Sequence, residues 1–384
     1  MINKLHKFSL LGGPLHRLGT KLGLVRSDVD TIPLGLALGL LTWGIMIILS
    51  LIDGTINQTF LLSVIGIHVR LLLVIPMFFV CETIVAPRMS AFIKAIVKSG
   101  VVIPSSLPAL DKEIFRVNKW INTWLPEFIF LLLSAFLALA DSHFQLYGTT
   151  ASVTASKVTE LSMANQWYWI VCLTLFRFLM LRWLWHLGLW CFILWRISRL
   201  DLNLLPTHPD GAAGLGYLEV VQSHFIPLVF ALSALQAAML TEEISAQKMD
   251  FGAIYPPILL VLIVDAVLFL GPLFIFSSKL WACKVKALSE YMEFSAQYVK
   301  DFDNKWLHNK APTQEQLLGT PDLQSLADLN NSISVVRNMR WVPMSMPLLV
   351  TLLSAALVPM LPLLLLKYPI TELAEKFFTN LVGF

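Results

Sequence analysis

Charged side chains are scarce in this sequence of 384 residues. Asp, Glu, Lys and Arg make up only 14% of it, whereas soluble domains average about 25%. Hydrophobic residues make up 57%, and the mean hydropathy is +0.71. This shortage of charge, together with long apolar stretches, excludes an ordinary soluble domain and predicts a polytopic membrane protein. Residues 1–384 are therefore treated as a single integral membrane domain.

Several familiar signatures are also missing. The four cysteines form no CxxC pair and lie in or beside apolar stretches (Cys81, Cys172, Cys191, Cys283), so we expect no disulfide framework, no metal site and no cofactor. A net charge of +3 is too small to indicate nucleic acid as a partner. No P-loop, GxGxxG, HExxH or GxSxG motif is present, which makes an enzyme less expected than a non-enzyme.

Seven stretches are apolar enough to cross a bilayer, which takes about 20 residues. They cover roughly residues 33–52, 59–84, 124–140, 167–195, 217–240, 254–281 and 342–366. We therefore predict an all-α membrane helix bundle of about seven transmembrane helices. Gly35 and Gly39 form a GxxxG pair in the first span, which favours close helix packing or formation of a homo-oligomer.

Lys and Arg concentrate in alternate connectors, and this distribution predicts the orientation. The basic regions are residues 1–30, 88–123 and 282–341, whereas the loop 141–166 contains only Lys157. We predict the N-terminus inside, the C-terminus outside, 1–30 as a basic cytoplasmic segment and 141–166 as a periplasmic loop. Both basic connectors carry helix start signals, at Ser106 and at Thr320–Pro321, so we expect a helical cytoplasmic collar.

Ionisable side chains inside the spans are the strongest functional pointers, because each costs about 2.5–3.5 kcal/mol to insert. The second span contains His68, Arg70 and Glu82, the fourth contains Arg177, Arg182 and His186, and the sixth contains Asp265.

Their spacing predicts which of them meet. Arg70, Arg177 and Asp265 lie about ten residues, or about 15 Å, from the outer ends of their spans, so we expect them at one level, with an Arg–Asp pair. Arg182 and His186 are four residues apart on one helical face, and His68 and Glu82 share a face if their helix is regular. A surplus of Arg over Asp favours a small anion or a lipid headgroup as ligand. The alternative is a buried ion pair that only fixes helix packing.

The connector 204–216, "LLPTHPDGAAGLG", is unusually polar between two apolar spans. One interpretation is a turn in which Thr207 and Asp210 cap the next helix. A second is an anion-binding nest of free N–H groups, with Arg199 and His208 adding charge. The third is a catalytic or metal role for His208 and Asp210, with Gly214 and Gly216 shaping the turn.

Three stretches together resemble a family of uncharacterised bacterial inner-membrane proteins: "HVRLLLVIP…E" at 68–82, "RISRLDLNLLPTHPDGAAGLGYL" at 196–218 and "DLQSLADLNNSISVVRNMRWVP" at 322–343. The resemblance implies a multi-pass protein of the bacterial inner (plasma) membrane and no particular activity. It draws attention to His208, Asp210, Gly214, Gly216, Ser325 and Asp328. Here Ala212-Ala213 replace a larger polar residue and a glycine.

The residues thus favour a membrane transport protein or channel in the lipid bilayer. It would have an anion-favouring mid-membrane site (Arg70, Arg177, Arg182, Asp265, His68, Glu82, His186) and a cytoplasmic gate at 204–216. One alternative is a membrane-embedded enzyme that acts on a lipid or phosphorylated headgroup, with His208 as acid/base and Asp210 orienting it. The other is a non-catalytic scaffold or sensor subunit whose cytoplasmic collar binds a partner.

Overall fold

A computed structural model describes residues 8–26, 29–144, 162–308 and 320–367. Within them the chain is helical and forms no strands, as the composition predicted. Six helical stretches are long and apolar enough to cross a membrane: Ile32–Ile52, Ile65–Lys98, Met163–Ser198, Tyr217–Ser245, Phe251–Leu307 and Met346–Leu366. A pair of helices bent by 42°, Pro104–Asn122 and Leu125–Ala140, provides a seventh if it counts as one span. The fold is that of a multi-pass membrane helix bundle.

The α-helices are α1 (Gly13–Lys21), α2 (Ile32–Ile52), α3 (Ile56–Thr59), α4 (Ile65–His68), α5 (Ile75–Lys98), α6 (Leu107–Asn122), α7 (Leu125–Phe144), α8 (Met163–Trp167), α9 (Leu173–Ser198), α10 (Tyr217–Ser223), α11 (Ile226–Ser245), α12 (Tyr255–Asp265), α13 (Ser277–Phe302), α14 (Pro321–Asn338), α15 (Met346–Leu357) and α16 (Leu364–Lys367). Four π-helical turns continue them: η3 (Val69–Val74), η6 (Tyr168–Cys172), η8 (Ala266–Leu270) and η10 (Asp303–Leu307). Short 3₁₀ turns are η2 (Leu62–Val64), η4 (Pro104–Ser106), η7 (Phe251–Ile254), η9 (Gly271–Phe276) and η11 (Val358–Leu363).

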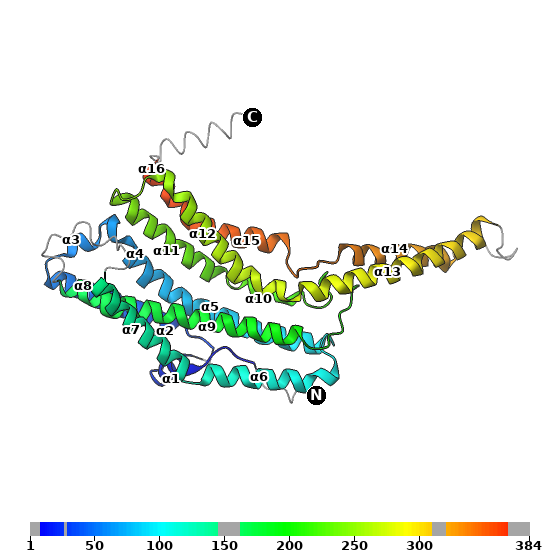
Figure 1. Ribbon diagram of the computed structural model, residues 1–384, viewed down its shortest axis with the longest axis horizontal. Coiled ribbons are helices and arrows are strands. Elements are labelled where there is room, and N and C mark those ends of the chain that lie inside the picture. Colours follow the sequence, from blue (N-terminus) through cyan, green and yellow to red (C-terminus); the bar gives the residue numbers. More distant parts are fainter. Residues whose placement is uncertain (1–7, 27–28, 145–161, 309–319, 368–384) are drawn as a thin grey trace.

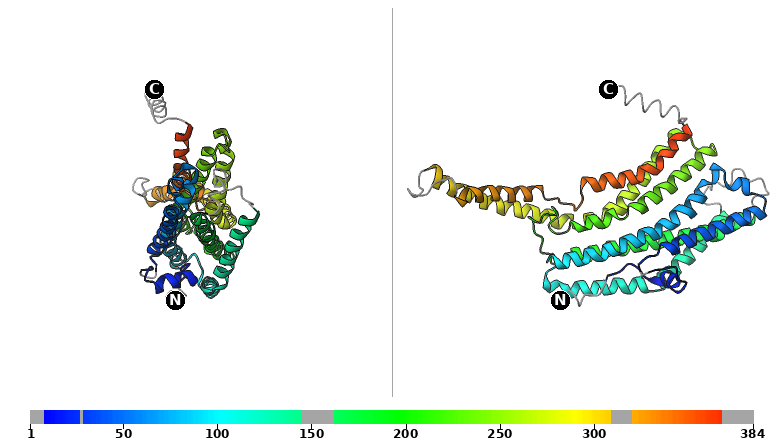
Figure 2. Two further views of the ribbon diagram at one scale, coloured as in Figure 1. Left: turned by 90° about the vertical axis from the view of Figure 1, so that its left-hand side faces the viewer. Right: turned by 180° about the vertical axis from the view of Figure 1, so that it is seen from behind.

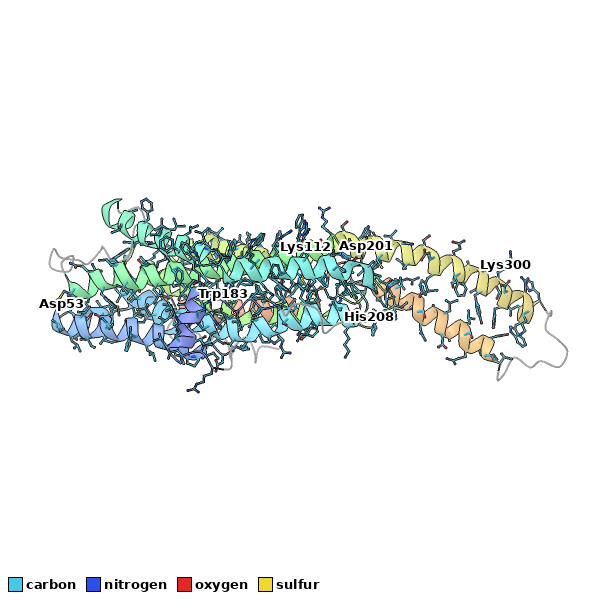
Figure 3. The ribbon with its side chains drawn as sticks, turned by 90° about the horizontal axis from the view of Figure 1, so that it is seen from below. Asp53, Lys112, Trp183, Asp201, His208 and Lys300 are labelled. Atoms are coloured by element: carbon cyan, nitrogen blue, oxygen red, sulfur yellow. The ribbon has the colours of Figure 1, made fainter. Side chains whose placement is uncertain are left out.

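Most helices run along one long axis, and α13 with α14 projects from one end of the bundle (Figure 1). We call α13, η10 and α14 the arm. Seen from behind, the arm stands clear of the other helices (Figure 2). Asp53 lies at the opposite end of the molecule, Trp183 lies within the bundle, and Lys300 lies far out along the arm (Figure 3).

Aromatic side chains fill the centre of the bundle. Phe78 stacks on Phe176 and on Trp183, with ring centroids 6.2 and 6.4 Å apart. Phe225 packs edge-on against Trp183 at 6.3 Å and contacts Phe269 at 5.5 Å. Trp183 also donates a hydrogen bond from Nε1 to the carbonyl oxygen of Phe78 at 3.1 Å. Such pairs bury large apolar areas and fix the spacing of helices α5, α9, α11 and η8.

The GxxxG pair packs α2 closely against α5 and η3, which confirms the packing role predicted for it. A Cβ atom at Gly35 would lie 2.6 Å from the Phe79 ring, and one at Gly39 would lie 2.4 Å from the carbonyl oxygen of Leu71. The close approach at Gly39 is to backbone, which cannot move aside as a side chain can.

Replacing Gly39 by Ala should therefore destabilise the protein by about 1–3 kcal/mol, the usual cost of forcing extra volume into a packed core. Gly44 in the same helix is a matched control, because a Cβ atom there meets nothing within 4 Å. Gly44→Ala should be neutral or slightly stabilising, since Ala is the better helix former. The free energy of unfolding in detergent micelles measures both effects, and equal values for the two variants would contradict the expectation.

The helix bounds differ from the predicted spans in one informative way. The second span begins at Ile65 rather than near residue 59, because residues 56–64 turn aside as α3 and η2. It then continues to Lys98, well past the predicted end at residue 84. The basic connectors are mostly helical where described, except for a turn at 99–103, and α14 begins at Pro321 as predicted. Of the loop 141–166, residues 145–161 lie outside the described residues.

Candidate functional site

A buried ionic cluster joins three helices inside the bundle. Arg182 on α9 donates from Nη1 and Nη2 to the two carboxylate oxygens of Glu82 on α5, at 2.9 and 2.7 Å. Its Nε donates to Oε1 of Glu127 on α7 at 3.1 Å. The other oxygen of Glu127 accepts a hydrogen bond from the backbone N–H of Leu15 at 2.9 Å. The Arg182 and Glu82 side chains are 2% and 3% exposed, so this is a fully desolvated site.

The charge of this cluster is opposite to that predicted. Two carboxylates surround one guanidinium, so the three groups together carry one net negative charge. Because Arg182 is bound by both acids, it offers no positive charge to an external anion. The predicted surplus of Arg therefore does not hold at this level, since Glu127 was not counted among the buried acids.

His186 lies beside the cluster, one helical turn after Arg182. It is 5% exposed, and its ring packs edge-on against Trp183 with centroids 6.4 Å apart. His186 and Glu82 both line a small cavity that is otherwise mostly apolar, with Leu10, Met89 and Phe225 among its walls. The cavity has room for about one water molecule. The structure thus brings together three of the predicted residues, Glu82, Arg182 and His186.

His68 instead lies near the end of the bundle opposite the arm, where it contacts residues of other elements. Its Nδ1 accepts a hydrogen bond from Nε1 of Trp43 at 2.9 Å, and its Nε2 lies 2.7 Å from the carbonyl oxygen of Thr59. The ring of Phe60 stacks on it at 5.3 Å. His68 and Glu82 therefore contact different elements, since the fourteen positions between them span about 21 Å along the helix. The π-helical turn η3 also interrupts the regular α-helical spacing between them.

Arg70 and Asp265 do not meet. Arg70 donates a hydrogen bond to the hydroxyl of Tyr168 and lies over the ring of Phe176, 5.3 Å from its centroid. Asp265 is 7% exposed, and its Oδ2 accepts a hydrogen bond from Ser233 at 3.4 Å.

The positions of these residues along their helices differ from those expected. Arg70 lies five residues into the helical stretch that begins at Ile65, or about 8 Å. Arg177 and Asp265 each lie fourteen residues into theirs, which begin at Met163 and Phe251, or about 21 Å. These counts differ because the second helical stretch starts later than its hydropathy indicates. The guanidinium of Arg70 nevertheless reaches the ring of Phe176, the residue before Arg177, so the common level of the three residues stays a prediction.

The connector 204–216 is organised around Asp210. Its Oδ1 accepts hydrogen bonds from the N–H groups of Ala212 and Gly214 at 2.8 and 3.2 Å, and its Oδ2 accepts one from Gly216 at 2.7 Å. These are the donors that the nest interpretation assigned to an external anion. The loop is thus a nest of N–H groups that binds the carboxylate of Asp210 in place of an external anion. Of the two predicted capping residues, Thr207 and Asp210, it is Asp210 that accepts the hydrogen bond from the N–H group of Gly216, the N-cap residue of α10.

The glycines of the connector are required by its geometry. Gly214 has a φ of +96°, and a Cβ atom there would lie 2.5 Å from the Val101 side chain. At Gly216 a Cβ atom would lie 2.7 Å from that of Asp210. Both positions exclude larger residues because the loop folds tightly onto Asp210 and the chain beside it.

Arg340 ties this connector to the segment after α14. Its Nη2 donates to the carbonyl oxygen of Asp210 at 2.8 Å, and its Nη1 donates to Oε2 of Glu219 at 2.7 Å. Its backbone N–H donates to the carbonyl oxygen of Gly211 at 2.8 Å. Ser345, just before α15, hydrogen-bonds to the other oxygen of Glu219. The second and third stretches of the family resemblance therefore meet at one joint, at the root of the arm.

His208 and Asp210 do lie together, as the catalytic interpretation requires. Nδ1 of His208 lies 2.9 Å from Oδ1 of Asp210, and both side chains are partly exposed. Arg199 instead lies over the ring of Trp195, 5.5 Å from its centroid. Ser325 is exposed on α14, and Asp328 accepts a hydrogen bond from Gln324 on the same helix. Among the described residues no group of three His, Cys, Asp or Glu side chains is placed to hold a metal ion.

The connector should be sensitive to acid but not to mild changes of pH. Burial raises the pKa of Asp210, but hydrogen bonds from the N–H groups of Ala212, Gly216 and Gly214 outweigh it and lower this pKa below its usual value of about 3.9. A lowered pKa stabilises the fold above the usual value, and the effect is lost as the pH falls through the folded-state pKa. Amide exchange at these three residues should stay protected from pH 7 to 5 and lose protection below about pH 4. Loss between pH 7 and 5 would contradict this assignment.

Sequence reasoning missed Glu127, Tyr168, Glu219 and Arg340. Only Glu127 carried a local signal, because it is an acid that follows Pro126 at the start of an apolar span. Comparison with family models, with curated proteins and with solved structures finds no match to this chain, so the candidate sites rest on their own geometry.

Proposed function

We propose that this protein is a non-catalytic scaffold of the bacterial inner membrane, whose bundle anchors the arm for binding a protein partner in the cytoplasm. The observation that carries the proposal is the length of one helical stretch. Phe251–Leu307 has 57 residues, or about 85 Å at 1.5 Å per residue. The hydrocarbon core is only about 30 Å thick, so more than half of this stretch lies beyond it. The distribution of Lys and Arg favours the cytoplasmic side for the arm.

Contacts between α13 and α14 support a stiff projection. Near the tip, Asp322 accepts hydrogen bonds from Nζ of Lys305 at 2.8 Å and from Nε1 of Trp306 at 3.1 Å. Near the root, Nζ of Lys284 donates to the carbonyl oxygen of Met339 at 2.7 Å. A rigid element can present a binding surface without a large loss of conformational entropy on association.

The surface of the arm also suits a protein partner. Phe294 is 61% exposed and Leu323 is 48% exposed, on the two different helices of the arm. Apolar side chains that stand exposed beyond a bilayer have no lipid to cover them, and such surfaces mark sites of protein interaction. The small cavity and the aromatic core of the bundle fit an anchor better than a wide channel.

The test uses the full chain purified from its native membrane. We expect another polypeptide to co-purify with it in a fixed ratio, and Phe294→Glu with Leu323→Glu to lower that ratio at least tenfold. Gln324→Glu is the control, because this residue is also exposed on α14 but adds no apolar surface. An unchanged ratio in the double variant, or no second polypeptide at all, would overturn the proposal.

Transport is the second candidate, and the buried cluster favours it. Glu82, Glu127 and Arg182 leave one net negative charge beside His186 and a water-sized cavity. Carboxylates and histidines inside membranes commonly carry protons, so this charge suits a proton better than the anion predicted from the Arg residues. Vesicles containing the protein and a pH-sensitive dye should then take up protons, and Glu82→Gln should abolish the uptake. Equal uptake by the wild type and Glu82→Gln would exclude this role.

The lipid-headgroup enzyme has less support. His208 and Asp210 are within contact, but both Asp210 oxygens already accept backbone hydrogen bonds. Arg196, a nearby cation that could contact a phosphate in such an enzyme, donates instead to Oε1 of Glu113 at 2.7 Å.

A further inference from the structure

The arm carries a largely apolar stripe, most of which is exposed. The residues of this stripe follow one another along α13 at intervals of four, three, four, three and four positions: Trp281, Val285, Leu288, Met292, Ser295 and Val299. We call them the seam. This spacing is the heptad repeat of a coiled coil, with Val285, Met292 and Val299 at a positions and the others at d positions. Four of the six are well exposed: Trp281 by 55%, Val285 by 49%, Met292 by 52% and Val299 by 39%.

The helix α14 packs on a neighbouring strip of the same helix. Asp322 of α14 contacts Tyr298 and Lys305, and Met339, just after α14, contacts Lys284. These three partners of the α14 segment lie at g positions of the same heptads. Leu288 and Ser295 of the seam are partly buried, whereas the exposure of the other four seam residues is not explained by the pairing with α14. A groove of about 530 Å³ runs along its outer half, lined by Met292, Ala296, Val299 and Asp303 among others.

We infer that the seam is the contact between two copies of this chain, which form a parallel, two-stranded coiled coil through their α13 helices. The inference rests on the proposed function only in taking the arm as an interaction surface. Two copies in one membrane have the same orientation, so a two-fold axis along the membrane normal places their α13 helices side by side, parallel and in register. Valine at a positions is the choice that favours two parallel strands.

The composition of the seam fits a copy of itself. No seam residue is charged, so no like charges oppose each other when identical helices meet in register. The charged side chains of this helix lie outside the seam, including the exposed pair Lys286 and Glu290. Small residues beside the seam, Ala282, Ser289 and Ala296, also recur every seven positions and allow close approach. Shared membrane anchoring raises the local concentration of one arm near another, which strengthens a short coiled coil without new contacts.

The experiment is cysteine cross-linking of the full chain in its membrane. Cys191 and Cys283 are first replaced by Ser, because they are partly exposed, whereas Cys81 and Cys172 are buried. Met292→Cys and Val285→Cys place a thiol in the seam, and Glu290→Cys and Gln297→Cys place one on exposed positions of another face of α13. After mild oxidation we expect a disulfide-linked dimer at least tenfold more abundant for the two seam variants. Equal yields at all four positions, or no dimer at the seam, would overturn the inference.

A second variant tests whether the cross-links record a stable dimer or only chance collisions between two chains. Met292→Glu with Val299→Glu should halve the protein mass measured by light scattering in detergent. The helix content should stay unchanged, because both residues are exposed within one chain. A mass that stays at the wild-type value would also overturn the inference. Cross-linking of Met292→Cys to a different polypeptide would overturn the second-copy contact but retain the arm as a scaffold surface. A seam dimer whose arm binds no second polypeptide would support the second-copy contact and overturn the scaffold proposal.

Discussion

Replacing Arg182 by Met should unfold the bundle or cost about 3–5 kcal/mol of stability, the usual effect of leaving buried charges without their partner. Methionine has a similar length and keeps the apolar packing, but Glu82 and Glu127 would then face each other with no cation between them. Both carboxylates are buried, and the cavity beside Glu82 has room for only about one water molecule, so water replaces the guanidinium poorly. The free energy of unfolding in detergent micelles, or loss of a single monodisperse species, measures the effect.

Two further variants separate charge from shape. Adding Glu82→Gln and Glu127→Gln to Arg182→Met removes all three charges, so most of the stability should return, since neutral replacements of buried ion pairs are often well tolerated. Arg116→Ala is the control for losing an Arg–Glu pair whose acid keeps a second partner. Arg116 is 38% exposed, and Glu113, although buried, still pairs with Arg196 at 2.7 Å, so the change should cost less than about 1 kcal/mol. If Arg182→Met behaves like Arg116→Ala, the cluster does not hold the helices together.

Replacing Asp210 by Ala should loosen the whole joint at the root of the arm. The change removes the acceptor of three backbone N–H groups, and each donor left unsatisfied when buried costs about 1–3 kcal/mol. Because Asp210 is partly exposed, water compensates in part, and we expect a total near 2–3 kcal/mol. The Sγ atom of Cys283 contacts the carbonyl oxygen of Leu204 in this connector at 3.7 Å. Its reaction with a maleimide should therefore become faster in the variant.

Asp201→Ala is the matched control for this prediction. Asp201 precedes the same connector and is exposed, so its loss should change neither the stability nor the reactivity of Cys283. Asp210→Asn keeps an oxygen acceptor but loses the charge, and it should fall between the two. Equal behaviour of Asp210→Ala and Asp201→Ala would show that the nest is not needed for the joint.

The sequence predicted the fold class and most of the spans because these depend on local hydropathy. It placed the start of the second span too early because hydropathy does not distinguish a membrane helix from an apolar turn, such as the one that Thr59 makes onto His68. It also placed the end too early, because α5 continues as a helix with an increasingly polar sequence. This shift of bounds places Arg70 five, rather than about ten, residues from the start of its helical stretch.

The candidate site was predictable only where its contacts are local. Asp210 accepts from residues two, four and six positions later, a distance at which an aspartate in a glycine-rich turn is a natural acceptor. Arg182, by contrast, meets Glu82 and Glu127 across 100 and 55 positions. Neither the depth nor the spacing of residues in a single sequence indicates which helices become neighbours. The two acids make the net charge of the cluster negative, whereas a positive site was predicted.

The contact between Glu127 and Leu15 has a consequence for biogenesis. Residues 8–21 emerge from the ribosome long before Glu127 and Arg182 are synthesised, since 112 positions separate Leu15 from Glu127. The segment made early must therefore wait until α7 and α9 have entered the bilayer before it can settle against them. α1 would then dock only after the central helices are in place. During translation it would remain open to protease until α7 and α9 have been inserted.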